Sequence, residues 1–161
     1  DDFVYNRDKS SEVVKMIETF DSSSAKGLMT CIEVPDEELN KYGVVETKRS
    51  NGSDFLSGLI EKPPTGTAPS NLVNISKYIL PAEIFDIIEQ QEKNSQSSEF
   101  QITDSILTLA KQQDVVIHKP SGKYLDSGYI FGWLKANLTV AWDDPELKAE
   151  LTDFIQSSLL K

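Results

Sequence analysis

The hydrophobic positions along the chain fall into runs of two kinds, some with helical spacing and some typical of strands. Val13, Ile17 and Phe20 lie three or four residues apart, which predicts an amphipathic helix over residues 10–20. The run LMTCIEV, residues 28–34, is short, apolar and rich in β-branched residues. It predicts a strand buried inside a sheet.

Turn and cap residues separate the later elements. Asn51-Gly52, between two such runs, predicts a β-hairpin. Pro81 is predicted to lie in the first turn of one helix, and Thr103 to cap another. The expected strands are 42–48, 54–61, 71–80 and 114–120, the expected helices are 81–91, 104–113, 130–142 and a last one from about 145, and a polar loop is expected over 93–98.

This alternation of strands and helices predicts an α/β fold with a partly parallel sheet. A chain of 161 residues is long enough for one well-filled core, so we expect a single domain over 1–161, with C-terminal helices from about residue 130. Trp133 is predicted to lie in the core together with Leu134 and Leu138, because the three share a helix.

Charge and composition exclude several classes of partner. The formal net charge is -10 and the chain has no run of basic residues, so nucleic acid and anionic membranes are not expected to bind. No apolar stretch approaches membrane-spanning length and none resembles a signal peptide, which indicates a cytoplasmic protein. Cys31 is the single cysteine and is predicted to be a buried side chain rather than a nucleophile.

The segment LIEKPP places an acid and a base side by side where a predicted strand ends. In open α/β sheets, ligands bind beyond the carboxyl ends of strands. The Glu61 carboxylate could accept hydrogen bonds from sugar hydroxyls, and the Lys62 ammonium could hold a phosphate. The dipeptide alone is equally consistent with a surface ion pair, so both interpretations stay open.

Five motifs in a fixed order carry a resemblance to a known family. KYGVV, LIEKP, APSNLVNISKYILPAEIF, EFQITDSI and KYLDSGYIFGWLKAN follow one another along the chain. In this order they resemble the second half of bacterial UTP:glucose-1-phosphate uridylyltransferases. The resemblance implies a Rossmann-like nucleotidyltransferase fold, a mixed β-sheet flanked by helices. It also implies transfer of a uridylyl group from UTP to glucose 1-phosphate, with release of pyrophosphate and a requirement for Mg²⁺.

The resemblance assigns a sugar-side role to five residues. It implies that Glu61 binds the glucose hydroxyls and that Lys62 binds the phosphate, with a catalytic role. The backbone of Tyr42 and Gly43 would lie against the sugar, which suits a residue without a Cβ. Asn71, in APSN, matches a position beside the sugar pocket.

Two carboxylates are implied as metal ligands. Asp126, in YLDSG, matches an aspartate that holds the metal and is also assigned to catalysis. One of the two opening aspartates matches its partner, with Asp1 favoured over Asp2. Carboxylate oxygens are the ligands that magnesium prefers. Without the resemblance, Asp126 would be interpreted as a turn residue and the first two as solvated terminal charges.

Part of the family's pattern is not found in this sequence. No GxGxR loop occurs, so the N-terminal nucleotide-binding portion is expected to be missing and the chain, which opens on DDFVYN, to be a fragment that makes no UDP-glucose alone. Tyr129 and Ile130 stand where the family has a polar residue and a lysine. The open alternatives are another sugar-1-phosphate nucleotidyltransferase, such as a thymidylyltransferase, and a non-catalytic sugar-phosphate-binding module. Strand edges left bare by the missing half indicate a homo-oligomer.

Overall fold

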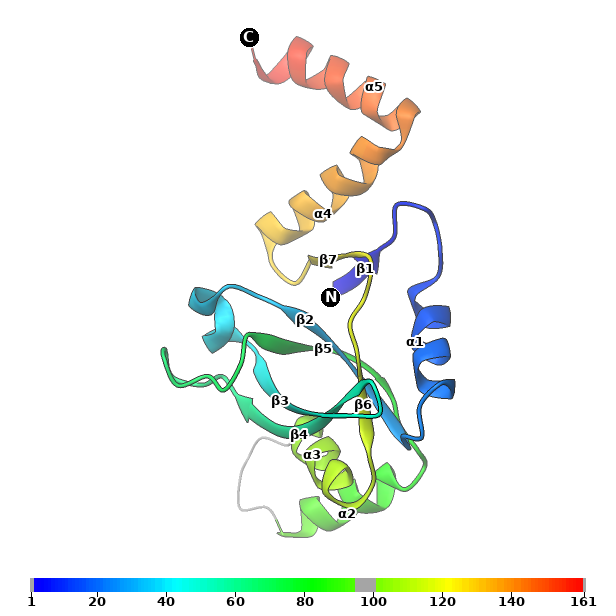
Figure 1. Cartoon of the computed structure of the whole chain (residues 1–161). Helices are drawn as coiled ribbons and strands as arrows, with labels where there is room; N and C mark the ends of the chain where they lie inside the picture. Colours follow the sequence, from blue (N-terminus) through cyan, green and yellow to red (C-terminus); the bar gives the residue numbers. More distant parts are fainter. Residues whose placement is uncertain (1, 95–100, 161) are drawn as a thin grey trace. The chain divides into compact units, whose positions relative to one another are not determined.

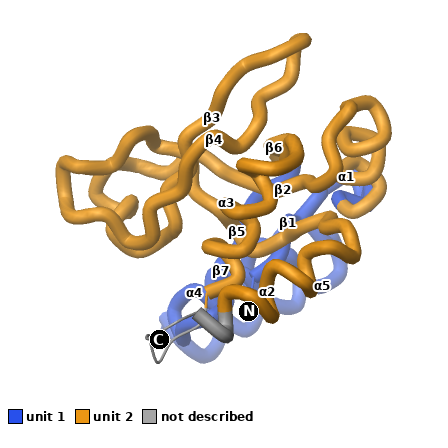
Figure 2. The backbone as a smooth tube through the Cα atoms, turned by 90° about the horizontal axis from the view of Figure 1, so that it is seen from below, with its two compact units in different colours: residues 1–12, 121–161 blue, residues 13–120 orange. Residues whose placement is uncertain are grey.

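The computed structural model describes residues 2–94 and 101–160 of the chain. These residues form two compact units, one of residues 13–120 and one of residues 1–12 together with 121–161 (Figure 2). The expectation of one domain over the whole chain stays a prediction. In the described parts of the sequence, no helix combines the length and the apolar character that crossing a membrane requires.

The larger unit is built on five strands whose hydrogen bonding closes into a barrel (Figure 1). Among the described residues of this unit, β2 and β6 pair in parallel and the other strand pairings are antiparallel. The predicted partly parallel sheet is thus confirmed, and its closure through Phe55 opposite Val116 was not predicted. The order around the barrel is β2 (Gly27–Glu33), β5 (Leu72–Ile79), β3 (Gly43–Ser50), β4 (Ser53–Glu61) and β6 (Val115–His118).

Helices cover both faces of this sheet because consecutive strand residues point to opposite sides. Leu28 on β2 lies in one apolar cluster with Met16 of α1. Its neighbour Met29 lies in another cluster, with Ile87 of α2 and Ile106 of α3. The predicted helices on both faces are therefore confirmed, with bounds α1 (Glu12–Asp21), α2 (Ile84–Asn94) and α3 (Ile102–Gln112). The short 3-10 helix η1 (Asp36–Lys41) was not predicted.

The hairpin of β3 and β4 turns where the sequence predicted. Asn51 and Gly52 have φ angles of +49° and +83°, the left-handed pair that a tight hairpin turn needs. Asparagine and glycine adopt this conformation at low cost, which explains why the chain reverses here.

Two helix starts differ from prediction. Helix α2 begins at Ile84, and Pro81 precedes it in a turn in which the Ile84 amide donates to the Pro81 carbonyl. Thr103 does not cap α3: it lies inside the first turn with its side chain buried, so it packs inward instead of closing the helix end. In the predicted polar loop, residues 93 and 94 belong to α2 and residues 95–98 lie outside the described part.

The smaller unit contains an antiparallel ribbon and the C-terminal helices. Strand β1 pairs with β7 in register, and the Arg7 guanidinium forms an ion pair of 2.8 Å with Asp143 at the end of α4. The Asp144 carboxylate caps the next helix by accepting from two backbone amides. The two predicted C-terminal helices are confirmed, with bounds α4 (Ile130–Asp143) and α5 (Pro145–Phe154). The unit also contains the strands β1 (Asp2–Tyr5) and β7 (Lys123–Asp126) and the terminal π-helix η2 (Ile155–Leu159).

The prediction that Trp133 belongs to the core is wrong. Its side chain is 55% exposed, and Leu134 and Leu138 are exposed too. Within α4 the buried residues are Gly132 and Ala136, because small side chains mark the side of the helix that packs closely.

Replacing Thr30 with valine tests the packing of β2. The Thr30 side chain is fully buried, and its Oγ1 has no hydrogen-bond partner among residues 2–94 and 101–160. Valine keeps the shape and removes the unpaired hydroxyl, so Thr30→Val should raise the free energy of unfolding by about 1 kcal/mol, measured by denaturant unfolding. Thr19→Val is the matched control and should lower it, because Thr19 Oγ1 lies 2.8 Å from His118 Nδ1. Loss of stability in both variants would contradict this account.

Candidate functional site

The end of β4 brings a carboxylate against a glycine. Glu61 is the last residue of β4 and pairs with Gly43, the first residue of β3. A Cβ placed on Gly43 would lie 2.9 Å from Glu61 Oε2, so the carboxylate lies directly over the glycine backbone. The structure therefore unites two of the predicted site residues, and a side chain at position 43 would displace the carboxylate.

Lys62 follows in an unusual backbone conformation. Its φ angle is +45°, in the left-handed region that non-glycine residues rarely adopt. Its amide donates a hydrogen bond of 3.0 Å to the carbonyl of Tyr42, which holds the chain in place as it leaves the hairpin. The Lys62 side chain is exposed while Pro63 is buried. The exposed Lys62 side chain therefore extends from an anchored backbone.

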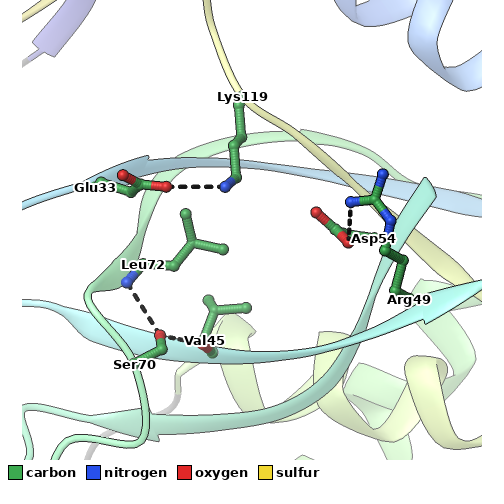
Figure 3. Close-up of polar contacts among 7 residues, drawn as sticks. All are labelled: Glu33, Val45, Arg49, Asp54, Ser70, Leu72 and Lys119. Carbon is green, nitrogen blue, oxygen red and sulfur yellow. Dashed lines mark hydrogen bonds and ion pairs between the residues drawn. The ribbon is translucent and has the colours of Figure 1, made fainter. Parts of the chain in front are cut away.

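The loop after Lys62 is tied to the barrel at its far end by Ser70 (Figure 3). Ser70 Oγ donates to the Val45 carbonyl at 2.6 Å and accepts from the Leu72 amide at 3.0 Å. Asn71, the predicted neighbour of the sugar pocket, accepts from the Val34 amide through its carbonyl at 3.0 Å, and its side chain is exposed. Sequence reasoning placed Asn71 at this edge but missed the anchoring role of Ser70.

An ion pair joins the carboxyl ends of the two parallel strands. Lys119 Nζ, just after β6, lies 3.0 Å from Glu33 Oε1 at the end of β2 (Figure 3). Both side chains are about half exposed, so the pair adds little stability. The figure also shows the Arg49–Asp54 pair of 3.3 Å near the hairpin turn, in which the arginine side chain is exposed and that of Asp54 is partly buried. Neither pair was found from the sequence.

Two further polar residues, missed by sequence reasoning, form a hydrogen-bonded pair on β5. Asn74 and Tyr78 both belong to β5, and Asn74 Nδ2 donates to the Tyr78 hydroxyl at 2.6 Å. Burial is the largest effect on the pKa of Tyr78 and raises it, while the hydrogen bonds of Asn74 and Ser76 lower it. Residues four apart on a strand share a face, so the segment NISKY carried a signal that was overlooked.

Asp126, the predicted metal ligand, lies in the smaller unit at the end of β7. Its Oδ1 accepts from the Gly128 amide at 2.9 Å, so it does act as a turn residue. Across the ribbon it stands directly opposite Asp2, whose Oδ2 accepts from the Tyr124 hydroxyl at 2.9 Å. Asp1 lies outside the described residues.

The side chains on the ribbon are of a chemical type that can bind a divalent cation. Residues directly opposite each other on antiparallel strands share a face, so Asp2 and Asp126 present carboxylates to one side. Such hard oxygen ligands suit Mg²⁺, which usually takes one or two carboxylates and fills the remaining positions with water and phosphate oxygens. Over residues 2–94 and 101–160, no group of three or more acidic, histidine or cysteine side chains forms a metal cage.

The comparison with known families defines the class. Residues 1–144 match the nucleotidyl transferase family, and the chain belongs to it. The mixed sheet flanked by helices is the fold of this family's solved relatives, so the expected fold is confirmed.

The individual relatives point to one activity within the class. The chain is 36% identical over 130 residues to the UTP--glucose-1-phosphate uridylyltransferase of Bacillus subtilis, which is 80% of this chain and 44% of that protein. It resembles the UTP-bound UGPase from Acinetobacter baumannii with a TM-score of 0.81 and 32% identity, over 98% of this chain and 54% of that one. A UDP-glucose pyrophosphorylase complexed with UDP-glucose gives 0.78 and 30%, over 89% and 54%. The chain thus spans about half the length of these relatives.

Cys31 provides a test of the barrel interior beside Tyr78. Its side chain is fully buried, and burial raises the pKa of the thiol far above its usual range, against a smaller lowering effect of Lys119. A raised pKa means less thiolate at a given pH, so native protein at pH 8 should react with a thiol reagent at least about tenfold more slowly than unfolded protein. The absorbance of the leaving group that the reagent releases on reaction with the thiol measures the rate. Equal rates would contradict the buried placement.

Proposed function

We propose that this chain is the sugar-phosphate-binding half of a UTP:glucose-1-phosphate uridylyltransferase. The observation that carries the proposal is the Glu61 carboxylate lying over Gly43 beside the anchored Lys62. The names of the similar proteins supply the substrates. In the reaction, a phosphate oxygen of glucose 1-phosphate attacks the α-phosphorus of UTP, the bond to the β-phosphate breaks, and pyrophosphate leaves.

Different residues of the larger unit bind the sugar and the phosphate of the substrate. The Glu61 carboxylate accepts hydrogen bonds from glucose hydroxyls, and the bare backbone of Gly43 with that of Tyr42 allows the sugar to approach closely. The Lys62 ammonium pairs with the phosphate. Asn71 lies beside the pocket at the loop's far end. Catalysis here consists of positioning and of offsetting negative charge, so no protein nucleophile is required.

Magnesium is proposed as the cofactor, held by Asp126 with Asp1. When bound, it would offset the negative charge of the reacting phosphates. Asp126 keeps one carboxylate oxygen engaged with the Gly128 amide, which orients the other, and Asp2 stands opposite it on the ribbon. UTP is the proposed second substrate, and we also propose a homo-oligomer in the cytoplasm.

Binding of glucose 1-phosphate to the purified chain tests the proposal. We expect saturable binding by calorimetry and by NMR shifts at residues 42, 43 and 61, and weaker binding of glucose 6-phosphate, whose phosphate sits at the other end of the sugar. An assay with UTP and Mg²⁺ would show whether the chain turns over alone. Absence of any sugar-phosphate binding would refute the proposal. Binding without turnover, alone or in the intact parent protein, would favour a non-catalytic module.

Lys62→Ala should weaken glucose 1-phosphate binding about tenfold to a hundredfold. A charge-assisted contact with phosphate is worth roughly 1.5 to 3 kcal/mol, and alanine removes the ammonium. Calorimetric titration measures the dissociation constant. Lys111→Ala, an exposed lysine on α3, is the matched control and should bind as the unaltered chain does. Equal affinity in the two variants would remove Lys62 from the phosphate site.

Asp126→Asn should reduce divalent-cation binding by the smaller unit. The amide can still accept from the Gly128 amide, so the turn is kept while the anionic ligand is lost. Paramagnetic broadening of NMR signals near β7 by Mn²⁺ reports occupancy, and the titration midpoint should rise severalfold. Asp153→Asn, exposed on α5, is the control for the change in net charge. An unaltered titration would leave Asp126 as a turn residue only.

A further inference from the structure

Helix α4 of the smaller unit turns one side inward. A Cβ on Gly132 would collide with the carbonyl oxygen of Asp126 and with the ring of Tyr129, so the backbone at this glycine lies directly against the end of β7. Ala136, four residues further along, is also buried and belongs to the same side of the helix. This close approach determines which residues of α4 are left on the opposite side.

The opposite side of α4 is an exposed apolar stripe. It consists of five large residues that follow one another at spacings of three or four and are 43–83% exposed, namely Ile130, Phe131, Leu134, Leu138 and Trp142. We call these five residues the α4 stripe. Such spacing is typical of a helix face that packs against another helix. Contiguous apolar surface of this kind marks an interaction site.

The charges on and after α4 favour a protein partner over a membrane. The helix contains two charged residues, Lys135 and Asp143. Lys135 Nζ lies over the rings of Tyr129 and Phe131, 5.8 Å and 5.2 Å from their centroids, at the edge of the stripe. Over residues 130–154, five acidic side chains outnumber two lysines, whereas helices that lie on membranes are rich in basic residues. A centre without charges is typical of protein interfaces.

The area of the α4 stripe matches what a second copy of the chain needs. Aromatic side chains bury roughly 150–250 Å² each and aliphatic ones somewhat less, so the five partly exposed residues offer on the order of 600 Å². A symmetric pair would bury about 1,200 Å² in total, the lower end of the range for specific interfaces. Trp133, 55% exposed, flanks the stripe and adds to this area. Two-fold dimers are also the commonest assemblies of identical chains.

We propose that the α4 stripe binds the same stripe of a second copy of this chain, with the two helices packed antiparallel across a two-fold axis. In this arrangement Leu134 lies against the partner's Leu138, and Phe131 lies against the partner's Trp142. Antiparallel packing also sets the two helix dipoles in opposite directions. The inference rests on the homo-oligomer of the proposed function and names its interface. It does not depend on the ligand of the larger unit.

Sedimentation equilibrium of the purified chain tests the interface. We expect a monomer–dimer equilibrium with a micromolar Kd, because the interface is at the small end of its class. Leu134→Glu and Leu138→Glu should each raise this Kd at least about a hundredfold, since a dimer would bury two unpaired carboxylates. Val13→Glu, an exposed position on α1, makes the same kind of change outside the stripe and should leave the Kd unchanged. Circular dichroism shows whether each variant is folded.

Disulfide trapping tests the orientation of the two helices. Leu134→Cys mixed with Leu138→Cys should cross-link between the two variants faster than either variant cross-links with itself, because these positions meet in the antiparallel pair. The native Cys31 is buried and does not compete. Faster cross-linking of each variant with itself would indicate parallel helices and overturn the arrangement.

The remaining outcomes separate this inference from its alternatives. A chain that stays monomeric, or a dimer that survives both glutamate variants, would overturn the proposal. Binding of the stripe to the separately produced part of a full-length relative that this chain does not cover, in place of a dimer, would overturn it too. Cosedimentation with phosphatidylglycerol vesicles that is lost in Leu134→Glu would assign the stripe to a membrane instead. Monomeric Leu134→Glu should still bind glucose 1-phosphate as the unaltered chain does, so the sugar-phosphate site and the interface succeed or fail separately.

Discussion

The parallel pairing of β2 with β6 is the constraint on which the rest of the structure depends. Strand β2 is hydrogen-bonded on both edges, to β5 and β6, and Gly27 to Cys31 are buried on both faces. Such a strand requires helices on both sides, which α1 provides on one face and α2 with α3 on the other. Its register also sets Asn74 opposite Cys31, so the polar cluster on β5 is positioned from this strand.

The candidate site is built from backbone that departs from regular strands. Lys62 and Ser76 are both left-handed, at a cost of about 1 kcal/mol or more each. Each conformation is held by a hydrogen bond from that residue's own amide, to the Tyr42 carbonyl and to Asn74 Oδ1. The backbone at these two residues thereby departs from the regular strand hydrogen bonding in a fixed conformation. A sugar-binding surface gains from this arrangement because its polar groups are oriented before the ligand arrives.

Local patterns predicted the elements well and the tertiary contacts poorly. Asn51-Gly52 fixed the hairpin, yet an unbroken register from Ser50 and Ser53 would set Glu61 opposite Tyr42. A bulge at Ser57 of β4, opposite Glu46 and Thr47, shifts the pairing by one residue and brings Gly43 there instead. That bulge has no sequence signal that we recognised. The family resemblance identified Glu61 and Gly43 as site residues. The position of Tyr78 depends on long-range packing, which the sequence alone did not reveal. Trp133 was misplaced because an apolar helix does not reveal what it packs against.

The hydrogen bond between the Ser76 amide and Asn74 Oδ1 restricts the order in which these positions could have changed during evolution. A glycine at position 76 would tolerate the left-handed backbone without support. A serine there adds strain that the Asn74 carbonyl offsets by holding the amide. A lineage that acquired asparagine first would pass through a stable intermediate, whereas one that acquired serine first would pass through a less stable one. The two positions are therefore expected to vary together, and an ancestral sequence should carry the asparagine no later than the serine.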